Sequence, residues 1–409
     1  MKPAAAKNIS FVSHSDIGGR GDGVQIMVHR GYAYVGHGFS NGISVIDVRD
    51  PRQPKTVNFI ACPPGTRALH LQTHDDLLLC VNAPSVWTME EFQKDEKVYF
   101  GASPVDSLKR QMGKFTSGVR VFDIKDPVNP REIGFMPVDG VGPHRIWYVG
   151  GRYAYASIHF ADYTDQIFAV IDLQDPTRPE VVGKWALPGM WSGGGEKPTW
   201  KPGRRYSLHH ALVAGDLAFG SWRDGGMTIL DIKDKTNPKL LAYRNTDPPF
   251  GGMTHSALPL PDRNLLVLAD EATGTDQPKY IWVYDVREPT NPVSIATMPQ
   301  PKEADYFAKG GKFGSHNLHE NRPGSFQSSR LVFATYYNAG VRAYDITDPF
   351  RPEEMGYFVP PNPEKMMDPR LGMPQVIQSA DCYVDTGGFM YVTDPNAGLY
   401  ILHYDGKLY

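Results

Sequence analysis

The amino-acid sequence predicts an all-β protein, and more narrowly a seven-bladed β-propeller, from one repeated motif and its spacing. Each copy of the motif is an apolar strand that ends in aspartate and leads into a turn closed by proline. The full copies are ISVIDVRDPRQP (43–54), VRVFDIKDPVNP (119–130), FAVIDLQDPTRP (168–179), MTILDIKDKTNP (227–238), IWVYDVREPTNP (281–292) and VRAYDITDPFRP (341–352). A shorter seventh copy, LYILHYDG, begins at Leu399. Most copies are about fifty to sixty residues apart, a spacing typical of one four-stranded propeller blade.

Between the copies, the sequence indicates further short strands joined by glycine-rich turns. Residues 144–158 show the pattern with HRIWYV, the turn GGR and YAYASI. Apolar residues alternate as they do in strands, and the 41 glycines and 35 prolines favour many tight turns. A ring of such sheets buries their faces and removes most free edges. We therefore expect residues 1–409 to form a single domain.

Two segments, 87–115 and 187–206, are longer than ordinary hairpin loops. Their length is typical of a lid over an active site, and the second also carries glycines, Trp191 and Trp200. A plain insertion between blades is the alternative. Arg204 or Arg205, at the end of the second segment, is expected to hold an anion such as a substrate carboxylate.

Composition narrows the class of partner. The 42 basic and 45 acidic residues give a net charge of −3, which provides no electrostatic attraction to nucleic acid or to an anionic membrane. The sequence contains no continuous apolar stretch of the roughly 18 residues that a membrane span needs. The three cysteines lack a paired spacing, so neither a disulfide framework nor a thiolate metal site is expected. These features predict a cytoplasmic protein that acts on a small molecule, and they leave its oligomeric state open.

The repeated strand resembles the LVIVD repeat, a family named for an L-x-I-x-D-like strand, and the resemblance extends over nearly the whole chain. It implies a β-propeller and leaves the activity open, because propellers serve both as binding scaffolds and as enzymes. The DPxxP ending is also similar, more weakly, to a repeat of the selenium-binding protein and methanethiol oxidase family.

Four successive repeats begin their innermost strand with a histidine. Innermost strands line the central channel of a propeller, so residues at one repeat position converge near the axis. Converging imidazoles favour a divalent transition metal. The alternative is that they bond to neighbouring blades or line a wet channel. The predicted ligands are His144, His209, His255 and His316, with His70 and His319 as possible additions.

The ligand set decides the predicted chemistry. Four imidazoles leave open positions on iron(II) or copper, which suits an oxidoreductase or oxygenase acting on a small oxygenated or aromatic substrate. Such a shell is similar to that of the carotenoid-cleavage oxygenases, and iron is the favoured metal. If a carboxylate such as Glu271 or Glu320 replaces a histidine, iron, manganese or zinc would act as a Lewis acid in a lyase or hydrolase. That set resembles the histidine-rich sites of propeller polysaccharide lyases.

Further residues complete the predicted site. His210 or an adjacent carboxylate is the expected general base of the Lewis-acid route. Arg145 is expected to hold an anionic group, and Tyr336 is expected at the same mouth of the channel. A binding scaffold without catalysis is the third hypothesis.

Overall fold

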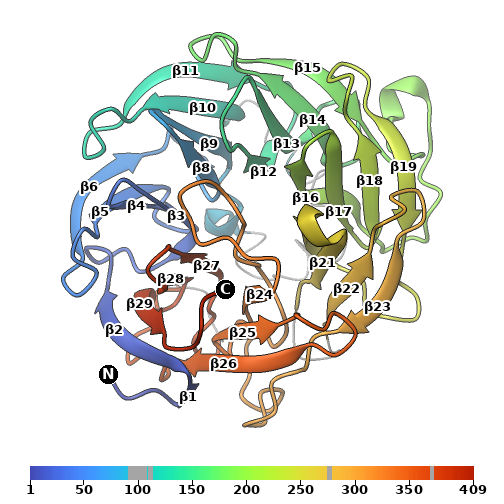
Figure 1. The fold of residues 1–409 in the computed structure, drawn as a ribbon. Coiled ribbons are helices and arrows are strands. Elements are labelled where there is room, and N and C mark those ends of the chain that lie inside the picture. Colours follow the sequence, from blue (N-terminus) through green and yellow to red (C-terminus); the bar gives the residue numbers. More distant parts are fainter. Residues whose placement is uncertain (91–107, 109–113, 274–278, 369–372) are drawn as a thin grey trace. The chain divides into compact units, whose positions relative to one another are not determined.

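The computed structural model describes residues 1–90, 108, 114–273, 279–368 and 373–409. Within these residues, the elements with defined bounds are strands β1 to β29 and three 3-10 helices, η1 (Val86–Thr88), η2 (Ser192–Gly194) and η3 (Pro261–Arg263) (Figure 1). The predicted all-β class is confirmed. In the part of the chain that is described, no helix is long and apolar enough to cross a membrane.

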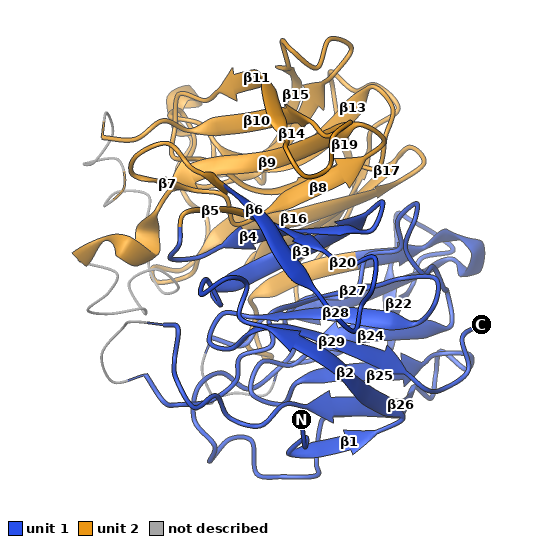
Figure 2. Ribbon diagram, turned by 90° about the vertical axis from the view of Figure 1, so that its left-hand side faces the viewer, with its two compact units in different colours: residues 1–40, 44–59, 258–409 blue, residues 41–43, 60–257 orange. Residues whose placement is uncertain are grey.

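The chain divides into two compact units, which are described separately (Figure 2). Unit 1 contains residues 1–40, 44–59 and 258–409, and unit 2 contains residues 41–43 and 60–257. The division passes through strands β5, β6 and β20. The single domain expected from the sequence stays a prediction.

In unit 1, two four-stranded antiparallel sheets combine strands from both ends of the sequence. One has the order β1 (Ala5–Lys7), β26 (Glu353–Val359), β25 (Val341–Asp345), β24 (Leu331–Thr335). The other has the order β2 (Ile9–Ser15), β29 (Gly398–Tyr404), β28 (Phe389–Asp394), β27 (Asp381–Val384). A third sheet, mostly in unit 1, has the order β3 (Gly23–His29), β4 (Tyr32–His37), β5 (Gly42–Asp47), β6 (Lys55–Ala61).

Unit 2 contains two sheets of its own. In the first, β7 (Thr66–Arg67) and β8 (Leu71–His74) both pair with β9 (Leu77–Pro84), which is followed by β10 (Gly118–Asp123) and β11 (Arg131–Pro137). The second has the order β12 (Gly142–Trp147), β13 (Tyr153–His159), β14 (Ile167–Asp172), β15 (Glu180–Trp185).

The remaining sheet has eight strands and consists of two sets of four. The first set is β16 (Tyr206–Ala214), β17 (Leu217–Arg223), β18 (Met227–Asp231) and β19 (Lys239–Arg244). The second set is β20 (Thr254–Leu260), β21 (Leu265–Asp270), β22 (Ile281–Asp285) and β23 (Val293–Thr297). Their link between β17 and β20 is one residue pair, Arg223 with Thr254.

The repeated motif forms one strand of each set and the turn after it. The motif aspartate accepts a hydrogen bond from the backbone N–H two residues later, as Asp47 does from Arg49 at 3.1 Å. The other full copies do the same through Asp123, Asp172, Asp231, Asp285 and Asp345. The next acidic residue repeats this contact, as Asp50 does with the N–H of Arg52 at 3.0 Å. The motif thus ends a strand because two carboxylates in series satisfy turn N–H groups.

Small residues in the fourth strand let the repeats pack closely. A Cβ at Gly134 would lie 2.4 Å from the carbonyl oxygen of Pro176, in the turn of the following repeat. A Cβ at Gly183 would lie 2.0 Å from the carbonyl oxygen of Lys235, at the matching position one repeat later. Each outer strand therefore rests against the next motif turn through backbone atoms.

The N-terminal strands pair with strands from the C-terminal part of the sequence. Strand β2 pairs with β29, the strand of the seventh copy, at the edge of its sheet. Strand β1 pairs with β26, the strand that follows the sixth copy. An apolar cluster buries the faces of these two sheets, with the members Ile9, Leu331, Phe333, Val341, Ala343, Phe358, Cys382, Val384, Met390, Val392, Tyr400, Leu402 and Tyr404.

Candidate functional site

The histidines of unit 2 form a continuous row of buried rings. His144 on β12 lies between His70 and His209, with ring centroids 5.0 Å and 4.6 Å away. His209 on β16 stacks on His255 of β20, with centroids 3.6 Å apart. The repeat therefore brings three predicted ligands, together with His70, into direct ring contact.

Hydrogen bonds distinguish the ring nitrogens in this row. The Nδ1–H of His209 donates to the carbonyl oxygen of His255 at 2.8 Å, so the lone pair of the neutral ring lies on Nε2. Nε2 of His144 instead accepts from Nη2 of Arg223 at 3.4 Å. A cationic donor therefore lies where a metal bound to that nitrogen would lie, and the ligand role of His144 stays a prediction.

Burial keeps these imidazoles neutral. The pKa values of His70, His144, His209 and His210 all lie well below the ordinary value, first because burial disfavours the charged ring. Positive charge on nearby arginines lowers them further, with Arg223 and Arg145 acting on His144 and on His209. The row consequently supplies neutral rings in strongly positive surroundings.

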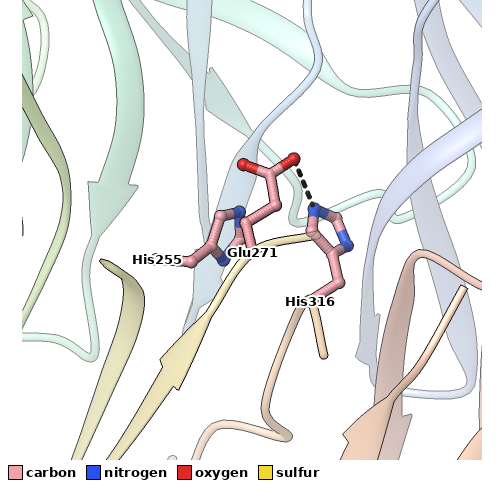
Figure 3. Close-up of side chains that lie close together, drawn as sticks. All are labelled: His255, Glu271 and His316. Atoms are coloured by element: carbon pink, nitrogen blue, oxygen red, sulfur yellow. Dashed lines mark ion pairs between the residues drawn. The ribbon is translucent and has the colours of Figure 1, made fainter. Parts of the chain in front are cut away.

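In unit 1, Glu271 and His316 face one another across a gap. Glu271 directly follows β21, and Oε1 of its carboxylate lies 4.0 Å from Nε2 of His316 (Figure 3). The hydroxyl of Tyr337 donates to the same oxygen at 2.9 Å, and Nζ of Lys312 lies 3.9 Å from it. Both Glu271 and His316 are buried.

The tautomer of His316 determines what faces the carboxylate. Nδ1–H donates to the carbonyl oxygen of Ala380 at 2.5 Å, so a neutral ring presents the Nε2 lone pair toward Glu271. Two electron-pair donors 4.0 Å apart are too distant for a hydrogen bond between them. A cation between the two donors would suit both.

His255 lies in unit 2, so its ligand role stays a prediction from the sequence. Nδ1 of His255 is 3.0 Å from the hydroxyl of Ser256. Within unit 1, Glu271 and His316 supply a carboxylate and an imidazole, which are donors used by mononuclear iron and zinc sites.

The comparisons with known proteins bear on the repeat and on the fold. The family model described as the LVIVD repeat matches residues 20–58 and 211–246. The chain contains LVIVD repeats. None of the curated proteins compared with this LVIVD-repeat chain matches it in sequence.

Solved structures resemble the LVIVD-repeat chain along nearly all of its length at low sequence identity. The periplasmic gluconolactonase PpgL of Pseudomonas aeruginosa is 12% identical, with a TM-score of 0.53 over 98% of this chain and 96% of that one. A protein from Lactobacillus plantarum is 10% identical, with a TM-score of 0.55 over 97% and 99%. The WD40 repeats of RRP9 are 9% identical, with a TM-score of 0.51 over 93% and 97%. WD40 repeats are propeller blades, so these likenesses show a propeller-like all-β fold.

The expected catalytic residues have different surroundings in the LVIVD-repeat structure. His210 follows His209 on β16 and points to the opposite face, where its ring contacts Trp147 with centroids 6.5 Å apart. Tyr336 is fully buried against Tyr344, and burial raises its pKa. The tyrosine that contacts Glu271 is the next one, Tyr337. The roles expected for His210 and Tyr336 stay predictions.

The structure separates the remaining histidines from the candidate ligands. Nε2–H of His319 donates to the carbonyl of Phe326 at 2.8 Å, while Nδ1 accepts from the N–H of Val384 at 3.2 Å. His37 and His159 also have hydrogen-bond partners at both ring nitrogens. The hydrogen bonds of His319, His37 and His159 therefore stabilise the fold. Glu320 is only partly buried, and its expected ligand role stays a prediction.

The arginines that were expected to hold an anion also differ in their surroundings. Arg204 pairs with Asp247 at 2.8 Å, and Arg205 pairs with buried Asp165 at 2.8 Å. These two arginines hold carboxylates of the protein itself, and their expected role at a substrate anion stays a prediction. Arg145, by contrast, lies in the positive surroundings of the histidine row.

The structure describes one of the two long segments more fully than the other. Most of segment 87–115 lies outside the described residues. In segment 187–206, indole N–H of Trp191 donates to Asp162 at 3.2 Å, and Trp200 stacks on Tyr206 with centroids 4.5 Å apart. Local contacts therefore hold the second segment in place, and a lid function for either segment stays a prediction.

Proposed function

We propose that this chain is a metal-dependent enzyme in which His316 and Glu271 bind one divalent transition metal. The observation that carries the proposal is the 4.0 Å separation between Nε2 of His316 and Oε1 of Glu271. Metal–nitrogen and metal–oxygen bonds of about 2.1 Å fit a gap of this size with small side-chain movements. The pair keeps one of the four predicted histidines and adds a carboxylate.

Hydrogen bonds from neighbouring residues orient the proposed ligands. The Ala380 carbonyl fixes the tautomer of His316, and the Tyr337 hydroxyl fixes the carboxylate of Glu271. Such outer contacts orient metal ligands and raise their donor strength. Tyr337 and Lys312, both bonded or close to Glu271, are therefore positioning residues at this site.

The favoured activity is an oxidoreductase or oxygenase acting on a small oxygenated or aromatic molecule. One histidine and one carboxylate leave coordination positions open, and both kinds of ligand are typical of mononuclear iron(II) enzymes that use oxygen. Iron held there would supply a centre at which oxygen and substrate can meet. The nearly balanced net charge of −3 supports a small-molecule partner over nucleic acid.

A Lewis-acid hydrolase or lyase is the second candidate. It is favoured by the same two donors, because histidine and glutamate also hold catalytic zinc that keeps a position open for water. In that reaction, the metal would polarise a carbonyl group, and no change in oxidation state would follow.

The arrangement of strands supports seven blades. Two sheets contain strands from both chain ends, three more begin at β3, β7 and β12, and the eight-stranded sheet contributes two sets of four. Each set contains one copy of the repeated strand. We infer one blade from each set.

Elemental analysis of the purified protein tests the metal site. We expect about one iron, manganese, copper or zinc ion per chain, lost in Glu271→Gln and in His316→Gln. Glu320→Gln is the matched control, because Glu320 is only partly buried and is not one of the two proposed ligands. Visible absorption and electron paramagnetic resonance would then distinguish a redox-active ion from zinc. A protein without stoichiometric metal, or variants that keep it, would support the binding scaffold instead.

A further inference from the structure

Unit 2 gathers three buried arginines around its histidine row. Arg145, Arg223 and Arg67 are 1%, 2% and 4% exposed. Nη2 of Arg223 lies 3.4 Å from Nε2 of His144. All three guanidinium groups lower the pKa of His144, which places their charges close to that ring. Burying one charged group already carries a large desolvation penalty, so three around one ring are expected to serve a purpose.

His70 adds a second, independent observation. Its ring meets that of His144 edge to face with centroids 5.0 Å apart, and the side chain is 4% exposed. Within the described residues, no group forms a hydrogen bond with its Nδ1. Burying a ring nitrogen without a hydrogen bond lowers the stability of the fold. A ligand placed beside the row would supply this hydrogen bond.

We propose that Arg223, Arg145 and Arg67, together with His144 and His70, bind an oxyanion, the phosphate or carboxylate group of a small molecule. Guanidinium groups match both groups because two N–H donors align with two oxygens. The neutral imidazoles supply further hydrogen bonds without adding to the charge. This proposal goes beyond the metal site and does not rest on it.

The binding of inorganic phosphate and of acetate, measured by calorimetry in a chloride buffer, tests the proposal. We expect at least one of them to bind and to raise the melting temperature. Phosphate alone would identify a phosphoryl group, and acetate would identify a carboxylate. Chelator-treated protein is measured in parallel, so that an anion held by a metal is separated from one held by arginines. Binding that vanishes with the metal, or no binding of either anion, would overturn the proposal.

Variants locate the site. Arg223→Gln removes a charged hydrogen-bond donor and should weaken binding about 10- to 100-fold. Arg152→Gln is the matched control, because Arg152 pairs with Asp172 and is half exposed, and it should bind as the natural chain does. Arg67→Gln repeats the test should Arg223→Gln fail to fold. Equal affinity in a folded arginine variant and in the control would refute the assignment.

Discussion

Replacing His319 by glutamine separates a histidine that supports the fold from one that binds metal. Both ring nitrogens of His319 are hydrogen-bonded to backbone groups, and burial lowers its pKa from 6.5 to about 4. The depressed pKa means that the unfolded chain takes up the proton first. The stabilisation is therefore present above pH 6.5 and is lost as the pH falls toward 4. A shift of this size corresponds to about 3 kcal/mol.

Urea unfolding followed by tryptophan fluorescence measures this effect in the natural chain and in His319→Gln. At pH 7 we expect the variant to be about 2–3 kcal/mol less stable, because two hydrogen bonds and their packing are lost. Near pH 4 the difference should nearly disappear. His316→Gln is the paired variant, expected to lose metal with a small change in stability. A stability difference for His319→Gln that is the same at both pH values would refute the reasoning, and so would loss of metal from His319→Gln.

Three further predictions concern single contacts. Tyr337→Phe removes the hydrogen bond to Glu271 and should weaken metal affinity about 10- to 100-fold, measured by competition with a chelator. Asp22→Asn should remove about 2 kcal/mol at neutral pH in urea unfolding. Burial raises the pKa of Asp22, but hydrogen bonds and a nearby histidine lower it to about 2, so this stability is lost as the pH falls from 3.8 toward 2. Gly183→Ala should lower the melting temperature, since its Cβ would lie 2.0 Å from the Lys235 carbonyl oxygen, an overlap that costs about 1–3 kcal/mol.

The repeated strands could be predicted from the sequence because their cause is local. Alternating apolar residues set the strand, and the two acidic side chains that follow accept hydrogen bonds from the turn beside them. The pairing of β1 and β2 has no such local sign. Their partners, β26 and β29, lie more than 340 residues further along the sequence. Neither AAK nor ISFVSHS carries the motif, so sequence periodicity gives no hint of where they pair.

The sequence named two residues of the candidate site, and it missed a third that contacts them. Repeat alignment singled out His316, and Glu271 was already expected as a carboxylate ligand; the two side chains lie 4.0 Å apart, and their ligand roles stay predictions. Tyr337 escaped the pattern because strand alternation ends at Thr335, and a turn follows in which Tyr337 has a φ of 47°. The turn directs Tyr337 toward Glu271 in place of Tyr336. A positive φ at a bulky residue is rare and leaves no periodic trace in the sequence.

The chemistry of each histidine depends on the repeat that follows it. Nδ1–H of His209 donates to the main-chain carbonyl of His255, which starts the next set of strands. Nδ1–H of His316 donates in the same way to Ala380, just before β27. A backbone carbonyl is present whatever side chain stands there, so the repeat geometry fixes the tautomer and turns the Nε2 lone pair toward the remaining space. His144 carries the same residue type at the same repeat position, yet Arg223 occupies its Nε2. The proposed site therefore includes His316, which faces the carboxylate of Glu271 from the preceding repeat, and leaves out His144, which faces a guanidinium group.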